Sequence, residues 1–160
     1  MKRKDKQVEL LEETSMVSEV ELIYHSKVKP ADRPLIRKSE EAYKLLINTW
    51  NKDTIELYEE FKVVLLNQAG RVIGIYKAGM GGLTRTIADP RLIITTALKA
   101  AACSIVLAHN HPSGNLTPSK SDEEMTRKMK AGAELLEIKV LDHLIITLDG
   151  YTSFADQGLL

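Results

Sequence analysis

The sequence predicts an α/β domain, and two observations support that prediction. Apolar segments with the pattern of β-strands alternate along the chain with segments whose apolar residues recur at helical spacing. The polar stretch "HNHPSG" directly follows one of the strand segments, and α/β sheets tend to place their chemistry at such strand ends. With 160 residues, 44% of them hydrophobic, the chain fits one domain with a sizeable core.

The first 55 residues divide into two predicted parts. Residues 1–16 are rich in charge and poor in apolar anchors, which favours a flexible or accessory arm. Residues 17–55 are predicted to form an N-terminal extension made of a strand and a short helix. The strand follows from the alternating apolar residues of "SEVELIYHSKV", and the helix from "SEEAYKLLINTW", in which Ser39 is a candidate N-cap.

A hairpin and a helix are predicted next. Two apolar runs in "EEFKVVLLNQAGRVIGIYKAG" flank a turn at residues 67–70, and we expect both strands near the centre of the sheet. A glycine-rich loop and a short extended piece then lead into the helix of "DPRLIITTALKAAA". Asp89 is a natural cap for this helix, Pro90 a natural first residue, and its end is expected near Ala102.

The last part of the chain predicts a strand, a helix and a closing strand. "SIVLAHNH" is an apolar strand, "EEMTRKMKAGAELL" carries an apolar stripe at helical spacing, and "IKVLDHLIITL" is a long strand. Ser119 or Ser121 can cap the helix, and Ser121 with Glu124 fits the pattern of a capping box.

Two histidines and an aspartate lie where the strand gives way to this helix. In an extended strand His109 and His111 point the same way, so both could bind one ion. The Pro-Ser-Gly break lets the chain return, so that Asp122 in the first helical turn could add an oxygen ligand. Such a set leaves one position of a tetrahedral zinc open for water, as in catalytic sites. Helix capping alone would explain the serines and acids, but not the two histidines.

The stretch "HNHPSGNLTPSKSD" resembles the RadC-like branch of the JAB/MPN (JAMM) metalloprotease superfamily. The metal motif of that superfamily is His-x-His, seven residues, Ser, two residues, Asp, and His109, His111, Ser119 and Asp122 fit every spacing. The resemblance runs from about residue 56 to the end of the chain. It implies that residues 56–160 form a single JAB/MPN domain with a cytidine deaminase-like fold, a mixed central β-sheet flanked by helices.

The resemblance also implies a chemistry, hydrolysis of an amide or isopeptide bond. Zinc held by His109, His111 and Asp122 would activate a water molecule and polarise the substrate carbonyl. Glu59 would move the proton from the water to the leaving amine, and the Ser119 hydroxyl would hydrogen-bond the oxyanion. The expected substrate is a peptide or protein, whose identity the sequence leaves open.

The choice of Glu59 as general base follows from its spacing, because RadC-like members place this glutamate two residues before a phenylalanine. Glu60 is the alternative. In a strand Glu59 shares a face with Phe61, whereas Glu60 shares a face with Lys62, which we expect to look toward solvent.

Charge bears on the rival functions. The 22 basic and 22 acidic residues cancel, so the chain lacks the positive field of a general nucleic-acid binder. An HNH nuclease would need a ββα metal finger in basic surroundings. RadC-like proteins carry a DNA-repair label, so a DNA-associated accessory role is one alternative, and a non-catalytic MPN scaffold is another.

The sequence predicts a cytoplasmic protein without a membrane partner. Cys103 is the only cysteine, which excludes an intramolecular disulfide framework and fits a reducing compartment. The N-terminal stretch lacks the apolar core of a signal peptide, and apolar runs fall short of a membrane span.

Overall fold

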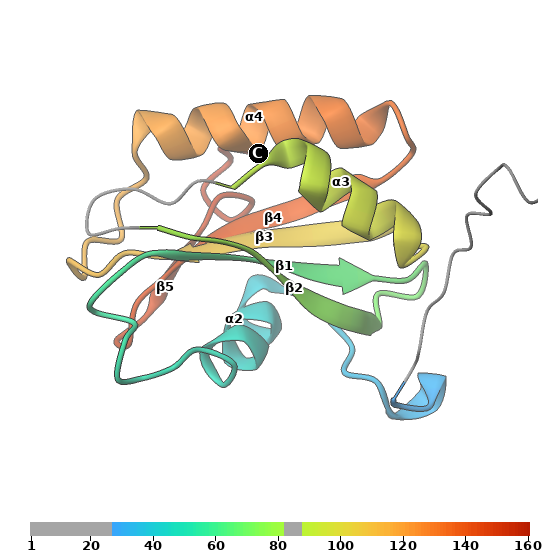
Figure 1. Cartoon of the computed structure of the whole chain (residues 1–160), viewed down its shortest axis with the longest axis horizontal. Helices are drawn as coiled ribbons and strands as arrows, with labels where there is room; N and C mark the ends of the chain where they lie inside the picture. Colours follow the sequence, from blue (N-terminus) through green and yellow to red (C-terminus); the bar gives the residue numbers. More distant parts are fainter. Residues whose placement is uncertain (1–26, 82–87) are drawn as a thin grey trace, which may run out of the picture.

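A computed structural model of the chain describes residues 27–81 and 88–160. The predicted arm at 1–16, almost all of the predicted strand at 18–28 and the extended piece before Asp89 lie outside the described residues. In the described part the strands form one mixed five-stranded sheet in the order β2-β1-β3-β4-β5, which confirms the predicted α/β class (Figure 1). The strands are β1 (Glu60–Leu66), β2 (Val72–Met80), β3 (Ser104–Asn110), β4 (Lys139–Ile146) and β5 (Tyr151–Ser153).

Neighbouring strands are antiparallel except for the parallel pair of β3 and β4. The hairpin of β1 and β2 is confirmed, and its turn is held by the side-chain oxygen of Asn67, which accepts from the N–H groups of Ala69 and Arg71 at 3.0 Å each. Gly70 adopts a φ of 72° in this turn, a conformation that suits glycine. The expectation that both strands lie near the centre is wrong for β2, which forms an edge of the sheet.

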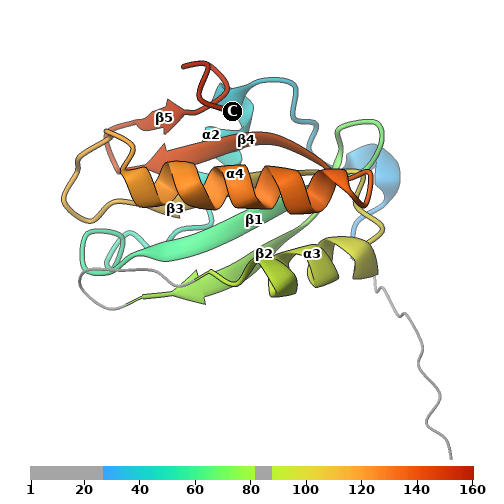
Figure 2. The same cartoon turned by 90° about the horizontal axis from the view of Figure 1, so that it is seen from above.

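Helices cover both faces of the sheet. Helices α3 (Pro90–Lys99) and α4 (Lys120–Glu134) lie on one face, and α2 (Ser39–Ile47) lies on the other, preceded by the short 3-10 helix η1 (Pro30–Asp32) (Figures 1 and 2). Each face has its own apolar core. Leu107 and Met129 belong to the core under α3 and α4, and Val106 belongs to the core against α2.

Two of the predicted helix caps differ in outcome. The Asp89 side chain caps α3 by accepting from the N–H of Arg91 at 2.9 Å, as predicted, and Pro90 is the first helical residue. The helix ends three residues before Ala102. Ser39 was wrongly expected to cap α2, because Lys38 is the N-cap and the Ser39 hydroxyl donates to Asp156 at 2.6 Å.

The segment before residue 56 packs against the rest of the domain. Leu46 of α2 and Trp50 are buried in the same core as Val64 and Leu144 of the sheet. Within the described ranges no helix has the length and apolar character to cross a membrane.

Helix α4 is the crossover that joins the parallel strands β3 and β4. A parallel pair requires such a connection. The start of α4 lies beside the C-terminal end of β3, at one end of the strands (Figure 2). The polar stretch "HNHPSG" lies at this end of the strands.

Candidate metal centre

Three side chains converge where β3 leads into α4. His109 is the penultimate residue of β3 and is 3% exposed, and the N–H of His111 still donates to the carbonyl of Ile146 on β4 at 3.1 Å. Asp122 lies in the first turn of α4. One potential ligand atom from each of His109, His111 and Asp122 lies within 4.8 Å of the other two, so this group could hold a metal ion.

The potential ligand atoms of the two histidines are close enough that a hydrogen or a metal ion must lie between them. The two histidine Nε2 atoms are 2.9 Å apart. The Nε2 of His109 is 3.2 Å from one oxygen of Asp122, and the Nε2 of His111 is 3.7 Å from the other. Two imidazole lone pairs cannot face each other at this distance unless a proton or a cation lies between them. The donor set of two nitrogens and one oxygen fits zinc.

A backbone carbonyl determines the tautomer of His111, that is, which of its two ring nitrogens carries the proton. The Nδ1 of His111 is 2.6 Å from the carbonyl oxygen of Asn115. Because a carbonyl can only accept, Nδ1 carries a proton and donates it. In the neutral ring the Nε2 of His111 is then unprotonated, and its lone pair points at His109 and Asp122, as a metal ligand requires.

The cluster also has the electrostatics of a cation site. The hydrogen bond with Asp122 raises the pKa of His111 against the effect of burial, and the negative charge of Glu59 adds to the rise. Burial alone would raise the pKa of the Asp122 carboxyl, but hydrogen bonds with His109, His111 and Ser119 hold it well below its ordinary value. Asp122 is therefore an anion near neutral pH.

The helix cap and the metal cluster share the same aspartate. Ser119 is the N-cap of α4, and its hydroxyl and its N–H donate to one oxygen of Asp122 at 2.6 and 2.7 Å, while the N–H of Asp122 donates back at 3.2 Å. The capping box predicted for Ser121 and Glu124 is therefore wrong, because Ser119 and Asp122 form it. Capping and ion binding are compatible, since the cap holds one carboxylate oxygen and leaves the other near His109.

The two adjacent glutamates stand at the start of β1, Glu59 directly before the strand and Glu60 as its first residue. Phe61 stacks on the ring of His109 with a centroid distance of 6.0 Å. Alternation carried back from Phe61 to Glu59 puts Glu59 on the face of the histidines, and the effect of its charge on His111 agrees with that placement. Glu60 is 5% exposed and faces Lys62, with 3.4 Å between the Lys62 Nζ and a Glu60 oxygen.

The expectation that Lys62 looks toward solvent is wrong. Its side chain is 1% exposed, its Nζ donates to the carbonyl of Thr49 at 2.9 Å, and it lies 3.9 Å from the ring centroid of Trp50. The tertiary fold covers this face of β1 with the segment that follows α2. Burial accordingly lowers the pKa of Lys62.

Asn110, between the two histidines, anchors the segment that leads into β1. Its side-chain oxygen accepts from the indole N–H of Trp50 at 3.1 Å and from the N–H of Glu60 at 2.7 Å. Its amide group donates to the carbonyls of Ile55 at 2.6 Å and Tyr58 at 2.9 Å. Strand alternation predicts that Asn110 points away from the histidines, but its four partners could not be named from the sequence.

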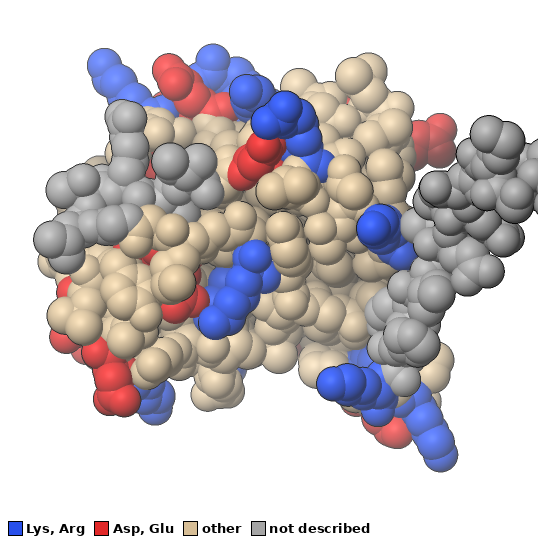
Figure 3. All heavy atoms as spheres, in the orientation of Figure 1, with Lys and Arg blue, Asp and Glu red and all other residues tan. Residues whose placement is uncertain are grey.

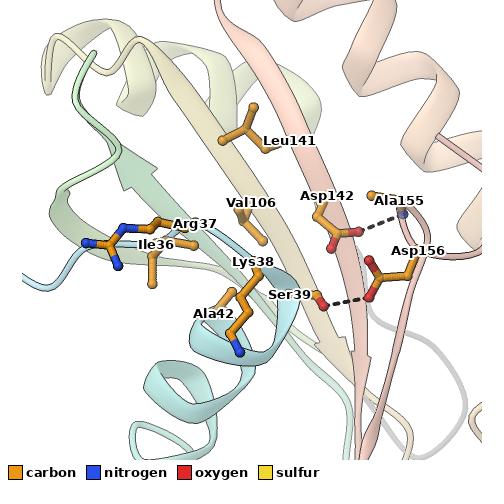
Figure 4. Close-up of a pocket in the computed structure, with 10 residues that line it drawn as sticks. All are labelled: Ile36, Arg37, Lys38, Ser39, Ala42, Val106, Leu141, Asp142, Ala155 and Asp156. Atoms are coloured by element: carbon orange, nitrogen blue, oxygen red, sulfur yellow. Dashed lines mark hydrogen bonds between the residues drawn. The ribbon is translucent and has the colours of Figure 1, made fainter.

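A pocket on the opposite face of the sheet is separate from this cluster. It lies between α2 and β4 and includes Ser39, Val106 and Asp142 in its lining (Figure 4). The Asp142 carboxylate there accepts hydrogen bonds from the Ser153 hydroxyl at 2.6 Å and from the N–H groups of Ala155 and His143. Burial raises the pKa of Asp142, and we assign it a structural role in holding the turn after β5.

Comparisons with known proteins agree on one family. A family model described as "RadC-like JAB domain" matches residues 36–159. A UPF0758 protein of Flavobacterium johnsoniae is 39% identical over 132 residues, which cover 77% of this chain and 58% of the relative. A UPF0758 protein of Porphyromonas gingivalis is 48% identical over 103 residues, which cover 64% and 45% of the two chains. The chain thus spans about half the length of the curated relatives it matches.

Proposed function

Because this chain belongs to the RadC-like JAB domain family, we propose that it is a zinc-dependent metallohydrolase that cleaves an amide or isopeptide bond. The observation that carries the proposal is the convergence of His109, His111 and Asp122 on one point. Each of the three side chains also has a hydrogen-bond partner outside the cluster that orients it, as metal ligands in proteins usually have.

His109, His111 and Asp122 would hold the ion. Imidazole nitrogen and carboxylate oxygen suit zinc, and three protein ligands leave a tetrahedral site one open position. When bound there, zinc supplies a lowered pKa for a water molecule and polarisation of a carbonyl group.

Glu59 is the residue to which we assign the proton transfers. Its carboxylate would take a proton from water and give it to the leaving amine. Two observations support this choice over Glu60. Glu59 belongs to the histidine face of the sheet and its charge contributes to the raised pKa of His111, whereas the Glu60 carboxylate faces the buried Lys62.

Ser119 is the residue to which we assign stabilisation of the oxyanion. Its hydroxyl is exposed at the start of α4 and at present donates to Asp122. Rotation of the hydroxyl would direct it at an oxygen on which negative charge develops. The N–H of Ser119 would meanwhile keep its 2.7 Å hydrogen bond to Asp122, so the helix cap need not open completely.

We propose a peptide or protein substrate rather than a nucleic acid. The equal numbers of basic and acidic residues support this choice. Figure 3 shows that on one face the Lys and Arg side chains are scattered among acidic ones and do not form a continuous basic stripe.

Metal content tests the proposal most directly. The full chain is loaded with zinc, desalted and measured by plasma mass spectrometry, alongside Asp122→Ala and Asp89→Ala. Both variants lose an aspartate whose side chain caps the start of a helix, Asp89 as the N-cap of α3 and Asp122 as the N3 residue of the α4 capping box, but only Asp122 belongs to the cluster. We expect near-stoichiometric zinc in the parent and in Asp89→Ala, and loss of zinc in Asp122→Ala. A folded parent that takes up no zinc would contradict the proposal.

Hydrolysis is tested separately with a library of peptides and isopeptides analysed by mass spectrometry. Glu59→Gln should retain zinc and lose cleavage, and Glu60→Gln is the control that changes the neighbouring carboxylate. Cleavage that survives in Glu59→Gln would remove Glu59 from the assigned role.

A further inference from the structure

A chain of buried hydrogen bonds runs behind the metal cluster. His143 of β4 is fully buried, and its Nε2 lies 2.9 Å from the Nδ1 of His109. The Nδ1 of His143 lies 2.6 Å from the hydroxyl of Thr126 on α4. The same hydroxyl donates to the backbone carbonyl of Asp122 at 2.6 Å. The chain therefore begins at the side chain of one proposed ligand and ends at the backbone of another.

The direction of every hydrogen bond in this chain follows from its last acceptor. The carbonyl of Asp122 can only accept, so the one hydroxyl hydrogen of Thr126 is used there. The Thr126 oxygen must then accept from His143, so the proton of His143 is on its Nδ1. A neutral ring carries one N–H, which leaves the Nε2 of His143 as an acceptor. His109 must consequently donate from its Nδ1.

The surroundings of His143 favour the neutral ring that this reasoning requires. The ring packs against Phe61 and Phe154, with centroid distances of 5.5 and 4.8 Å. An imidazolium ion in such an apolar, fully buried position would be poorly solvated.

We propose that Thr126 and His143 are positioning residues that fix His109 in the tautomer whose Nε2 lone pair faces the metal position. The inference rests on the proposed metal site. It assigns a task to Thr126, whose hydroxyl contacts the imidazole of His143 and the backbone of Asp122 rather than a ligand side chain. His111 is fixed in the same tautomer directly by a carbonyl, that of Asn115.

Removing the hydroxyl of Thr126 releases this constraint. Without it His143 has no acceptor for a proton on Nδ1, so the ring gains by placing its proton on Nε2 and donating to His109. His109 then accepts with Nδ1 and carries its own proton on Nε2, the nitrogen that must bind the ion. Zinc binding would then have to move the protons of both His109 and His143 back to Nδ1.

Histidine tautomers in the metal-free full chain test the inference by long-range ¹H–¹⁵N NMR. In the parent we expect His109 and His143 to be protonated on Nδ1, and His111 to supply the hydrogen that lies between its own Nε2 and the Nε2 of His109. Thr126→Val keeps the branched shape but lacks the hydroxyl, and should move the proton of His143 to Nε2. Thr126→Ser restores the hydroxyl and should restore the parent pattern.

Zinc affinity, measured by competition with a chromophoric chelator, supplies the second readout. Thr126→Val should weaken binding by about 10- to 100-fold, the usual cost of disturbing the outer partner of a metal ligand, here His143, and Thr126→Ser should bind nearly as the parent does. A proton on the Nε2 of His109 in the parent would overturn the inference, and so would Thr126→Val with parental tautomers and affinity. A parent that binds no zinc but shows the expected tautomers would overturn the proposed function and leave the hydrogen-bond chain standing.

Discussion

Replacement of Asn110 by aspartate probes the anchor that leads the chain into β1. Asn110 is fully buried, and its amide group donates to the carbonyls of Ile55 and Tyr58 at 2.6 and 2.9 Å. Aspartate has nearly the same shape and retains an oxygen for the N–H groups of Trp50 and Glu60. It has no amide hydrogens, however, so both carbonyls lose their donor and face an oxygen instead.

The size of the effect follows from these two lost donors. A buried polar group left without a partner costs about 1–3 kcal/mol, so the two carbonyls together cost about 2–6 kcal/mol of the free energy of unfolding. The total for a domain of this kind is about 5–15 kcal/mol. The substitution should therefore remove a large part of the stability, although Asn110 makes no apolar contact that an aspartate would lose.

Urea unfolding followed by tryptophan fluorescence measures this loss. Trp50 is the only tryptophan, and its indole N–H donates to Asn110, so the signal reports on the anchor itself. Asn67→Asp is the control, because Asn67 uses only its side-chain oxygen in the hairpin turn and aspartate keeps that oxygen. We expect the control to change the free energy by less than about 0.5 kcal/mol. An Asn110→Asp variant as stable as the control would refute the reasoning.

Two further predictions concern ionisable groups. Because the pKa of His111 is raised above its ordinary value of 6.5 and zinc must displace the proton, apparent zinc affinity should fall about tenfold per pH unit below that raised pKa and level off above it, as competition with a chelator across pH would show. A flat affinity from acid to neutral pH would contradict this. Lys62→Met should lower the free energy of unfolding by about 3–5 kcal/mol, because it leaves the buried Glu60 carboxylate without its nearest cation. Calorimetry of Lys62→Met and of Lys62→Met/Glu60→Gln checks this, since the double variant should recover stability if the unpaired charge is the cause.

Local chemistry accounts for the features that the sequence predicted well. The hairpin turn at residues 67–70 and the cap of α3 at Asp89 are formed by side chains that bond to backbone only two to four positions away. The spacing of His109, His111 and Asp122 was likewise readable, because a strand followed by a short break and a helix start leaves little freedom. Interactions over such short separations do not depend on what the rest of the chain packs against them.

Predictions failed where burial depended on distant segments. Lysine usually lies at the surface, so Lys62 was expected there. In the structure the segment after α2 buries it, and its Nζ lies against the ring of Trp50. The capping box was predicted two residues too late, because Ser119 and Ser121 offer the same local pattern. The engagement of Asp122 with both the cap and the histidines decides between them in the folded structure.

The identity of the proposed metal ligands and their order along the chain are properties of the sequence, since they need only strand parity, a turn and a helix cap. The hydrogen-bond chain behind them is a property of the tertiary fold. In β4 an extra residue, Leu141, interrupts the register with β3, so that His143 faces the same side of the sheet as Val140, three positions earlier. Strict alternation would turn His143 away from His109. The parallel pairing of β3 with β4 and the packing of α4 over them place His143 between His109 and Thr126, and no local pattern in the sequence encodes that contact.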